Sequence, residues 1–365
     1  MAIPEDLSTT VIYKDPHAYS SWPDITILED GDWIIAFSQA MRRHRRTHRD
    51  PTFHNLIVRS KDQGRTWDRF PQGVPGYRFS GIDCIAVTEL SNGDLLAHTV
   101  RDLFVTLDTA ERAAEYASFR ERRNTFPRPG EYRHVAPFPW VFTREGTYVI
   151  RSTDAGHTWE DPILVDLSPF QTGFSPRPIV ELSDGDLLLP QSEEALDPPQ
   201  AFLVRSTDAG RTWGNATLVA KNDRVGFWEP ALLVLSSGRI ISMLRAHKAG
   251  DYHLHQSVSF DGGWTWTNAR KTPMRGYPAH MLQLTDGRIL CAYGYRFEPY
   301  GIRACLSSDE GETWDIENEL IIRDDLPNAD LGYPTSAQLE DGTIFTTYYA
   351  QDEGVTCIMG STYKA

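Results

Sequence analysis

The sequence predicts an all-β protein, a six-bladed β-propeller with a small helical insertion in its second blade. Two repeated patterns predict this fold, because a repeat fixes an architecture. The first is the turn Ser-x-Asp-x-Gly-x-Thr-Trp, which occurs at residues 60–67, 152–159, 206–213, 259–266 and 307–314. The second is an apolar run, a polar-Gly turn and another apolar run. Its turns are Asp30-Gly31, Asn92-Gly93, Asp184-Gly185, Ser237-Gly238, Asp286-Gly287 and Asp341-Gly342.

Both patterns are typical of β-hairpins. In the first, the Asp can accept backbone N–H groups, the Gly supplies a positive φ, and Thr-Trp restarts a strand whose indole packs beneath the turn. A unit of two hairpins is a four-stranded sheet, which is one blade of a propeller. The sixth unit lacks the Ser-Asp-Gly-Trp turn and ends in residues 356–363. We expect residues 9–13 at the N-terminus to complete its sheet and hide the edge.

Size and composition limit the classes of function. The repeats span almost all of the 365 residues, which predicts one domain over 1–365. A net charge of −14 argues against a nucleic-acid or anionic-membrane partner. The four cysteines are scattered, so we expect buried thiols and neither a metal nor another cofactor. The first ten residues contain no apolar signal-peptide core, which leaves a cytoplasmic protein or one whose signal has been removed.

An insertion interrupts the second blade between about residues 101 and 148. Within it, residues 108–123 begin with the capping residue Asp108, carry Glu111 three positions later, and are rich in helix formers. This segment predicts a helix, either as a lid beside the channel or as a surface through which the protein would form a homo-oligomer.

Two groups of polar residues are expected near the channel. The basic loop 41–55, MRRHRRTHRDPTFHN, joins the second and third strands of blade one and therefore opens on the face where propellers bind ligands. In isolation such a charge run is more often a solvated surface loop. The innermost strands of blades three to six begin with the related segments 174–178, 227–230, 276–280 and 332–335, whose polar and aromatic side chains should converge on the axis.

The chain resembles the sialidase (neuraminidase) superfamily, because the five Ser-x-Asp-x-Gly-x-Thr-Trp turns match its Asp boxes, also called BNR repeats. The turn is a structural device, so the resemblance depends on the residues placed around the first-hairpin glycines. Glu229 stands nine residues before Gly238 and Arg245 seven after it, while Tyr333 stands nine before Gly342. These positions match the family's glutamate, its second arginine and its nucleophilic tyrosine. Asp50 matches the acid/base.

The resemblance implies an exo-glycosidase that releases a terminal acidic sugar, sialic acid or a related nonulosonic or uronic acid, from a glycan partner. A neutral phenol avoids the repulsion that a carboxylate nucleophile would meet beside the sugar's own carboxylate. A tyrosine ordinarily has a pKa near 10, so Glu229 would serve as the base for Tyr333, while Asp50 would protonate the leaving oxygen and then activate water. In the structural alternative, Glu229 and Arg245 are a buried pair, Tyr333 packs in the core and Asp50 starts a turn.

The family binds the substrate carboxylate with three arginines, and this chain lacks the first. Arg245 matches the second, and Arg303, with Arg296 as its competitor, is expected as the third. Ser21-Trp22-Pro23 stands where the family has Arg-x-Pro. Either another cation takes the place of the missing arginine, or the substrate is an acidic sugar other than sialic acid. The candidates are Arg177 on blade three and Arg42, Arg43 and Arg46 in the basic loop.

Further side chains are expected to line the sugar site. Trp22 and Trp228 lie at channel-facing positions and would stack on a sugar ring, although tryptophan is more often buried. Tyr277 is expected as a subsite wall or core residue. His280 falls near the channel mouth, where a hydrogen-bonding histidine is more common than a catalyst.

Two alternatives use the same scaffold. A uronate-directed polysaccharide lyase would neutralise the sugar carboxylate with arginines and remove the C5 proton with Tyr333 or a channel histidine. A non-catalytic propeller that binds acidic glycans would keep the pocket without turnover.

Overall fold

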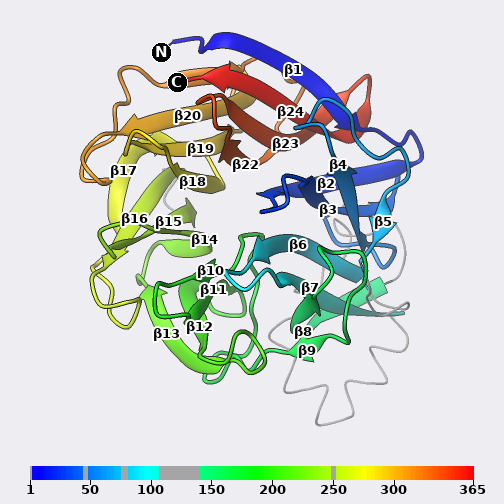
Figure 1. Ribbon diagram of the computed structural model, residues 1–365. Coiled ribbons are helices and arrows are strands. Elements are labelled where there is room, and N and C mark those ends of the chain that lie inside the picture. The colour runs from blue at the N-terminus through cyan, green and yellow to red at the C-terminus, as the bar shows by residue number, and fades with distance from the viewer. Residues whose placement is uncertain (1, 44–47, 75–80, 107–139, 248–251) are drawn as a thin grey trace.

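The computed structural model describes residues 2–43, 48–74, 81–106, 140–247 and 252–365, which form six four-stranded antiparallel sheets around a central axis (Figure 1). Blade one contains β2 (Ala18–Ile27), β3 (Trp33–Met41), β4 (His54–Ser60) and β5 (Gln72–Gly73). Blade two contains β6 (Gly81–Glu89), β7 (Leu95–Thr106), β8 (Trp140–Ser152) and β9 (Ile163–Leu164). Blade three contains β10 (Val180–Glu181), β11 (Leu187–Glu193), β12 (Gln200–Ser206) and β13 (Gly214–Ala220).

Blade four contains β14 (Gly226–Val234), β15 (Ile240–His247), β16 (His253–Ser259) and β17 (Arg270–Arg275). Blade five contains β18 (Ala279–Gln283), β19 (Ile289–Tyr295), β20 (Gly301–Ser307) and β21 (Leu320–Arg323). Blade six contains β22 (Gly332–Gln338), β23 (Ile344–Asp352), β24 (Val355–Lys364) and the N-terminal β1 (Glu5–Tyr13). The first strand of each sheet lies nearest the axis (Figure 1). The all-β six-bladed propeller is therefore confirmed.

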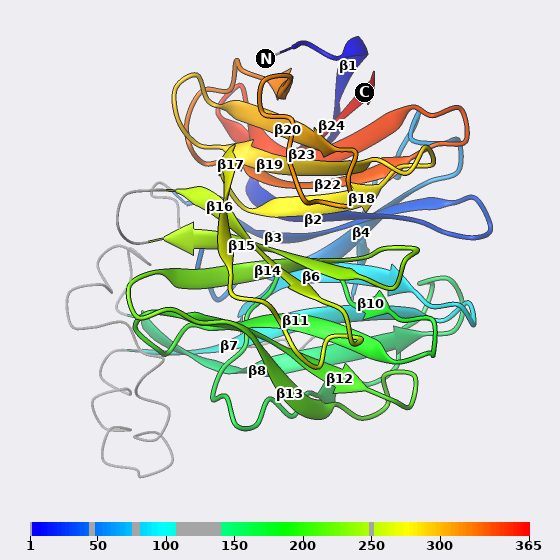
Figure 2. The same ribbon diagram turned by 90° about the vertical axis from the view of Figure 1, so that its left-hand side faces the viewer.

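The two ends of the chain close the ring in one sheet, as predicted. β1 pairs antiparallel with β24, with Thr10 opposite Gly360. Both termini consequently lie on blade six (Figures 1 and 2). Ala2 extends this closure to blade five, because its N–H donates to the carbonyl of Glu319 at 2.8 Å. β1 thus covers the edge of β24, which would otherwise be left unpaired.

The first hairpin of every blade turns at the predicted glycine. In all six turns the glycine N–H donates to the carbonyl of a leucine three residues earlier, at 2.8 to 2.9 Å, as between Gly238 and Leu235. Each of these glycines has a φ between 82° and 90°, a region that residues with a Cβ rarely adopt. This common turn fixes the register of each inner strand and therefore the position of the residues before it.

The five Asp-box turns are cross-linked by side chains. In the copy at 206–213, the Ser206 hydroxyl donates to Asp208 at 2.7 Å and accepts the Gly210 N–H at 2.8 Å. Asp208 also accepts the Thr212 N–H and hydroxyl at 2.8 and 2.6 Å, and the Trp213 indole donates to the Gly210 carbonyl at 3.1 Å. A strand restarts directly after the turn only here, at β13. In the other four blades the outer strand begins several residues later.

Stability should fall in acid through these turns. Hydrogen bonds from the hydroxyl and then the backbone N–H of the Thr four residues later lower the pKa of Asp62, Asp154 and Asp261 to about 2. Since the unfolded chain titrates near 3.8, this stabilisation is complete above about pH 4 and is lost as the pH falls towards 2. Thermal melts of Asp154→Asn should show a lower Tm at pH 6 and a smaller further loss below pH 4 than wild type. An unchanged Tm profile would contradict this.

The blade-two insertion is narrower than predicted. β7 continues to Thr106 and β8 begins at Trp140, so both ends of the expected insertion at 101–148 are paired strands, with Thr106 opposite Trp140. The predicted helix at 108–123 lies outside the described residues. No helix in the described part of the chain is long and apolar enough to cross a membrane. The four cysteines are buried thiols, as predicted.

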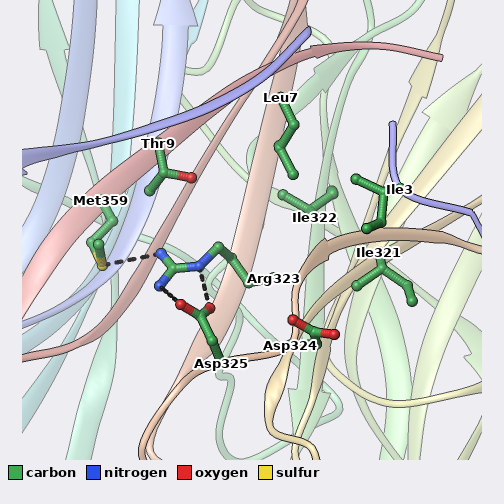
Figure 3. Close-up of a pocket in the computed structure, with 9 residues that line it drawn as sticks. All are labelled: Ile3, Leu7, Thr9, Ile321, Ile322, Arg323, Asp324, Asp325 and Met359. Carbon is green, nitrogen blue, oxygen red and sulfur yellow. Dashed lines mark hydrogen bonds and ion pairs between the residues drawn. The ribbon is translucent and has the colours of Figure 1, made fainter. Parts of the chain in front are cut away.

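A pocket of about 390 Å³ opens on the outer rim, where β1 and β24 meet β21 (Figure 3). It is lined by Ile3, Leu7, Thr9, Ile321, Ile322, Arg323, Asp324, Asp325 and Met359. Figure 3 shows Arg323 turned towards Asp325, to which its Nε donates at 2.6 Å. No lining residue comes from an inner strand, so this pocket is separate from the channel.

Candidate active site

Four inner strands carry a bulge nine residues before the first-hairpin glycine. The bulged residue has a positive φ in each case, although none is glycine: Trp22 at 53°, Cys84 at 56°, Glu229 at 49° and Tyr333 at 50°. Blades three and five have Pro176 and Pro278 at this place, and a proline ring fixes φ near −65°. Positive φ at a residue with a side chain costs roughly 1–3 kcal/mol and is concentrated at functional sites, where a bulge re-aims a side chain.

The bulges of blades four and six bring Glu229 and Tyr333 together. The Tyr333 hydroxyl donates to Glu229 Oε1 at 2.5 Å. Arg245, on β15, donates from Nη1 to both Glu229 oxygens at 3.2 and 3.0 Å and to the Tyr333 hydroxyl at 3.4 Å. Tyr333 and Glu229 are buried, whereas the Arg245 side chain is 19% exposed. The pair is therefore covered by a guanidinium that reaches solvent.

The protonation states of this pair follow from its surroundings. Burial, reinforced by the Glu229 charge, raises the pKa of Tyr333 well above its ordinary value. Burial also acts to raise the pKa of Glu229, but Arg245 and the hydrogen bond from Tyr333 outweigh it and hold that pKa below its ordinary value. At neutral pH the proton is on the phenol and the charge on the carboxylate, so the carboxylate is ready to accept that proton.

Arg296, and not Arg303, lies beside this pair. The Arg296 guanidinium lies 5.6 Å from the centre of the Tyr333 ring and 5.3 Å from that of Tyr277, and its Nε donates to the Leu331 carbonyl at 3.0 Å. Arg245 lies 4.5 Å from the Tyr277 ring centre. The two guanidiniums thus share the Tyr277 face, and Tyr277 forms a wall of the cluster.

Arg303 belongs to a second, buried cluster. Its Nη1 donates to Glu319 at 2.6 Å, and the Tyr293 hydroxyl donates to the same carboxylate. Of the two candidates for the third arginine, Arg296 therefore lies beside Tyr333, whereas Arg303 lies against Glu319. Arg303 is on β20, the third strand of its blade, where its side chain faces Glu319 at the base of β21.

Arg177 lies against the ring of Tyr333. It is fully buried, its Nη1 donates to the Pro334 carbonyl at 3.1 Å, and its guanidinium lies 5.9 Å from the Tyr333 ring centre. Burial lowers the pKa of Arg177 in spite of the nearby Glu229 charge. Its Nε and Nη2 contact no partner among the described residues. Of the substitute candidates that the structure describes, it is the one that lies against the Tyr333 ring.

The basic-loop arginines have other partners. Arg43 donates to Asp50 from Nε at 2.8 Å, and Asp50 also accepts the Thr52 N–H and hydroxyl at 2.9 and 2.6 Å. Asp50 is buried rather than turned out towards solvent. Arg42 is exposed and donates to the carbonyls of Pro16 and Gly354 at 3.1 and 3.0 Å, so it joins the outer loops of blades one and six. Arg46 lies outside the described residues.

The remaining predicted residues are mostly packed. The Trp22 ring is buried between Phe53 and Tyr333, at centroid distances of 5.1 and 6.2 Å, so it is packed in the core and is not open to the channel. Trp228 is half-buried, and its ring closes over Gly226. His280 Nδ1 accepts the Ser336 N–H at 3.2 Å. Burial and the Arg177 charge lower the pKa of His280 to about 3, which keeps it neutral.

One charged cluster was missed in the sequence. Arg49 Nη1 donates to Asp83 at 2.6 Å and to Asp102 at 3.1 Å, while Arg144 Nε donates to Asp102 at 2.8 Å. Glu194 approaches both arginines, at 3.5 and 3.7 Å. The spacing that located Glu229 and Tyr333 also pointed to this cluster, because Asp83 directly precedes the bulged Cys84, which stands nine residues before Gly93.

Comparisons with known proteins agree with this fold. A solved structure of unknown function from Dyadobacter fermentans is 25% identical, with a TM-score of 0.85 over 98% of this chain and 99% of that one. A Hadza microbial sialidase is 18% identical, with a TM-score of 0.67 over 95% of this chain and 66% of that one. An alpha-L-arabinanase of Penicillium chrysogenum is 13% identical, with a TM-score of 0.67 over 98% of both chains.

A xyloglucanase of a Paenibacillus species is 25% identical over 208 residues, and the chain spans only 19% of the length of that protein. The chain therefore shares its fold with a solved sialidase and a solved arabinanase. A family model described as the BNR repeat-like domain matches residues 134–346. The chain belongs to this family, and its propeller is of the sialidase type.

Proposed function

We propose that the protein is a sialidase-like exo-glycosidase that releases a terminal acidic sugar from a glycan, with Tyr333 as the nucleophile. The observation that carries the proposal is the 2.5 Å hydrogen bond from the Tyr333 hydroxyl to Glu229, a carboxylate whose pKa is held below its ordinary value. A phenol needs such a base within hydrogen-bond reach. The two residues come from strands 104 residues apart in the sequence and from strained positions, which favours a catalytic over a packing role.

The reaction is a double displacement. As the glycosidic C–O bond breaks, the Tyr333 oxygen bonds to the anomeric carbon, the phenolic proton passes to Glu229, and an acid protonates the leaving oxygen. In the second step the acid's conjugate base takes a proton from water, and the water oxygen attacks the anomeric carbon. The Tyr333 oxygen leaves and recovers its proton from Glu229. Asp50 is a candidate for this acid because it lies in the first-blade loop, where the resemblance expects the acid.

The charges beside Tyr333 support an acidic substrate. Arg245 and Arg296 flank one carboxylate, Glu229, so the cluster carries an excess positive charge that a substrate carboxylate would neutralise. A guanidinium binds a carboxylate through two parallel hydrogen bonds, which an ammonium cannot reproduce.

The test is a panel of fluorogenic sialosides, other nonulosonides, uronides and arabinofuranosides, the last because a solved arabinanase shares the fold. The proposal predicts release of fluorophore from an acidic glycoside and little from the arabinofuranosides. Turnover of the arabinofuranosides alone would mean that the substrate is a neutral sugar and not an acidic one. An unsaturated product absorbing in the ultraviolet would identify a lyase, and binding without turnover a glycan-binding propeller.

Arg245→Lys should separate acidic from neutral substrates. Lysine keeps a positive charge near Glu229 but loses the bidentate grip, so kcat/KM for the acidic substrate should fall about 10- to 100-fold, mainly through KM. The same variant should lose far less activity on an isosteric glycoside in which an amide replaces the carboxylate. An equal loss on both substrates would mean that Arg245 serves Glu229 and not the substrate.

A further inference from the structure

We infer that Asp83, and not Asp50, is the acid that protonates the leaving oxygen. This inference rests on the proposed function and changes one of its roles. Asp83 is on β6, directly before the bulged Cys84, and its carboxylate faces Arg49 of the loop between β3 and β4 and Asp102 of β7. It therefore lies on an inner strand, whereas Asp50 lies in the loop behind it.

Asp50 is fully engaged as a hydrogen-bond acceptor. Its two oxygens accept from Arg43 Nε and Nη2 at 2.8 and 3.3 Å and from the Thr52 N–H and hydroxyl at 2.9 and 2.6 Å. Both oxygens are thus held by residues of the same loop. The geometry suits a carboxylate that fixes the conformation of its loop.

Asp83 lies in a cluster with an excess of negative charge. Among the described residues, the buried carboxylates of Asp83 and Asp102 and the half-buried carboxylate of Glu194 face two guanidiniums, those of Arg49 and Arg144. Carboxylates that share a buried site cannot all be ionised at little cost, so one of them takes up a proton.

The hydrogen bonds indicate which carboxylate holds that proton. Asp102 accepts from both arginines, whereas Asp83 accepts only from Arg49. Asp83 is 2% exposed, and its Oδ1 has no partner among the described residues. Burial, with the Asp102 charge, raises the pKa of Asp83 to about 6, although Arg49 and Arg144 oppose this. An acid whose pKa lies near the working pH can both give and regain a proton.

Asp83 is also close to the nucleophile. The charges of Asp83 and Glu229 both act on the Cys84 thiol, and Cys84 packs in the same buried cluster as Tyr333 and Phe174. Arg49 and Arg144 lie over the Phe174 ring, at 5.3 and 4.9 Å from its centre. Both carboxyl groups thus lie near Cys84, as the inference requires of an acid and a nucleophile's base that act on one bound sugar.

The test compares Asp83→Asn with Asp50→Asn on two substrates, one with a poor alkoxide leaving group and one with an activated aryl group. Loss of the acid should lower kcat/KM for the poor leaving group about 10²- to 10⁴-fold and for the activated one far less. We expect this pattern for Asp83→Asn only. Wild-type kcat/KM should fall as the pH rises through about 6, because Asp83 must be protonated, and this basic limb should vanish in Asp83→Asn. The same changes in Asp50→Asn, with Asp83→Asn unaffected, would overturn the inference.

A second readout does not depend on activity. In the infrared difference between wild type and Asp83→Asn, the carbonyl stretch of one protonated carboxyl group should titrate near pH 6, and the subtraction removes the signal of Asp24, a second buried aspartate whose pKa burial raises to about 7. A difference spectrum without this band would overturn the inference even in an active enzyme. If the signal is found but wild type cleaves no substrate of the panel, the proposed function fails, and the catalytic role of Asp83 fails with it.

Discussion

Tyr333→Phe is expected to lower kcat by about 10³-fold or more while the substrate still binds. The change removes one oxygen atom and leaves the ring, which packs against Trp22 and Tyr349 at centroid distances of 6.2 and 6.0 Å. Binding should survive because Arg245 and Arg296 remain. Steady-state kinetics together with calorimetric titration of a substrate analogue into the variant would measure both effects.

The chain offers a matched control for this variant. Tyr293 donates to the buried carboxylate Glu319, which Arg303 also contacts, so the same three residue types form a second cluster away from the inner strands. Tyr293→Phe should lower the stability modestly and leave kcat close to that of wild type. If Tyr333→Phe kept most of its kcat, or if Tyr293→Phe lost as much, the phenol of Tyr333 would not be the nucleophile.

Glu229→Gln should lower kcat about 10²- to 10⁴-fold, because the amide keeps the shape of the side chain but cannot accept the phenolic proton. The pH dependence of activity tests the role of Glu229 independently. Glu229 must be ionised to act, and its pKa lies below the ordinary 4.5, so wild-type activity should be lost only as the pH falls below that value. This acid limb should be missing from the residual activity of Glu229→Gln.

Glu319→Gln is the corresponding control, because Glu319 is also buried between a tyrosine and an arginine. It should reduce the Tm and preserve both kcat and the acid limb. An acid limb that persisted in Glu229→Gln would show that another group sets it.

The fold was predictable because each repeat contains its own turn. The glycines that end the first hairpins fix the strand register, so counting back from Gly238 and Gly342 located Glu229 and Tyr333 on inner strands. Their meeting depends on the arrangement of the blades in a ring, whose closure by β1 the missing sixth Asp box indicated.

The two arginines Arg296 and Arg303 show what residue spacing cannot predict. Arg296 and Arg303 both follow the same hairpin, but their side chains have different partners, and the partner of Arg303 is Glu319 in the segment that leads into β21. Spacing gives a residue's place along a strand, whereas the choice of partner depends on packing between segments distant in sequence.

The Asp83 cluster illustrates the same limit. Its position nine to ten residues before Gly93 could be read from the sequence, as for Glu229. Its pairing with Arg49, from the preceding blade, and with Arg144, from beyond the insertion, depends on tertiary contacts. The basic loop reads as a surface feature in isolation, yet in the fold it supplies Arg49 to a buried site.

The most direct measurement is covalent trapping of the glycosyl-enzyme. A fluorinated acidic glycosyl fluoride forms the intermediate rapidly and hydrolyses slowly, so the intact mass should rise by one glycosyl group and peptide mapping should locate it. We predict the adduct on Tyr333, with none in Tyr333→Phe and slow formation in Glu229→Gln. An adduct on Glu229 or Asp83, or steady turnover of the reagent with no adduct, would contradict the tyrosine mechanism.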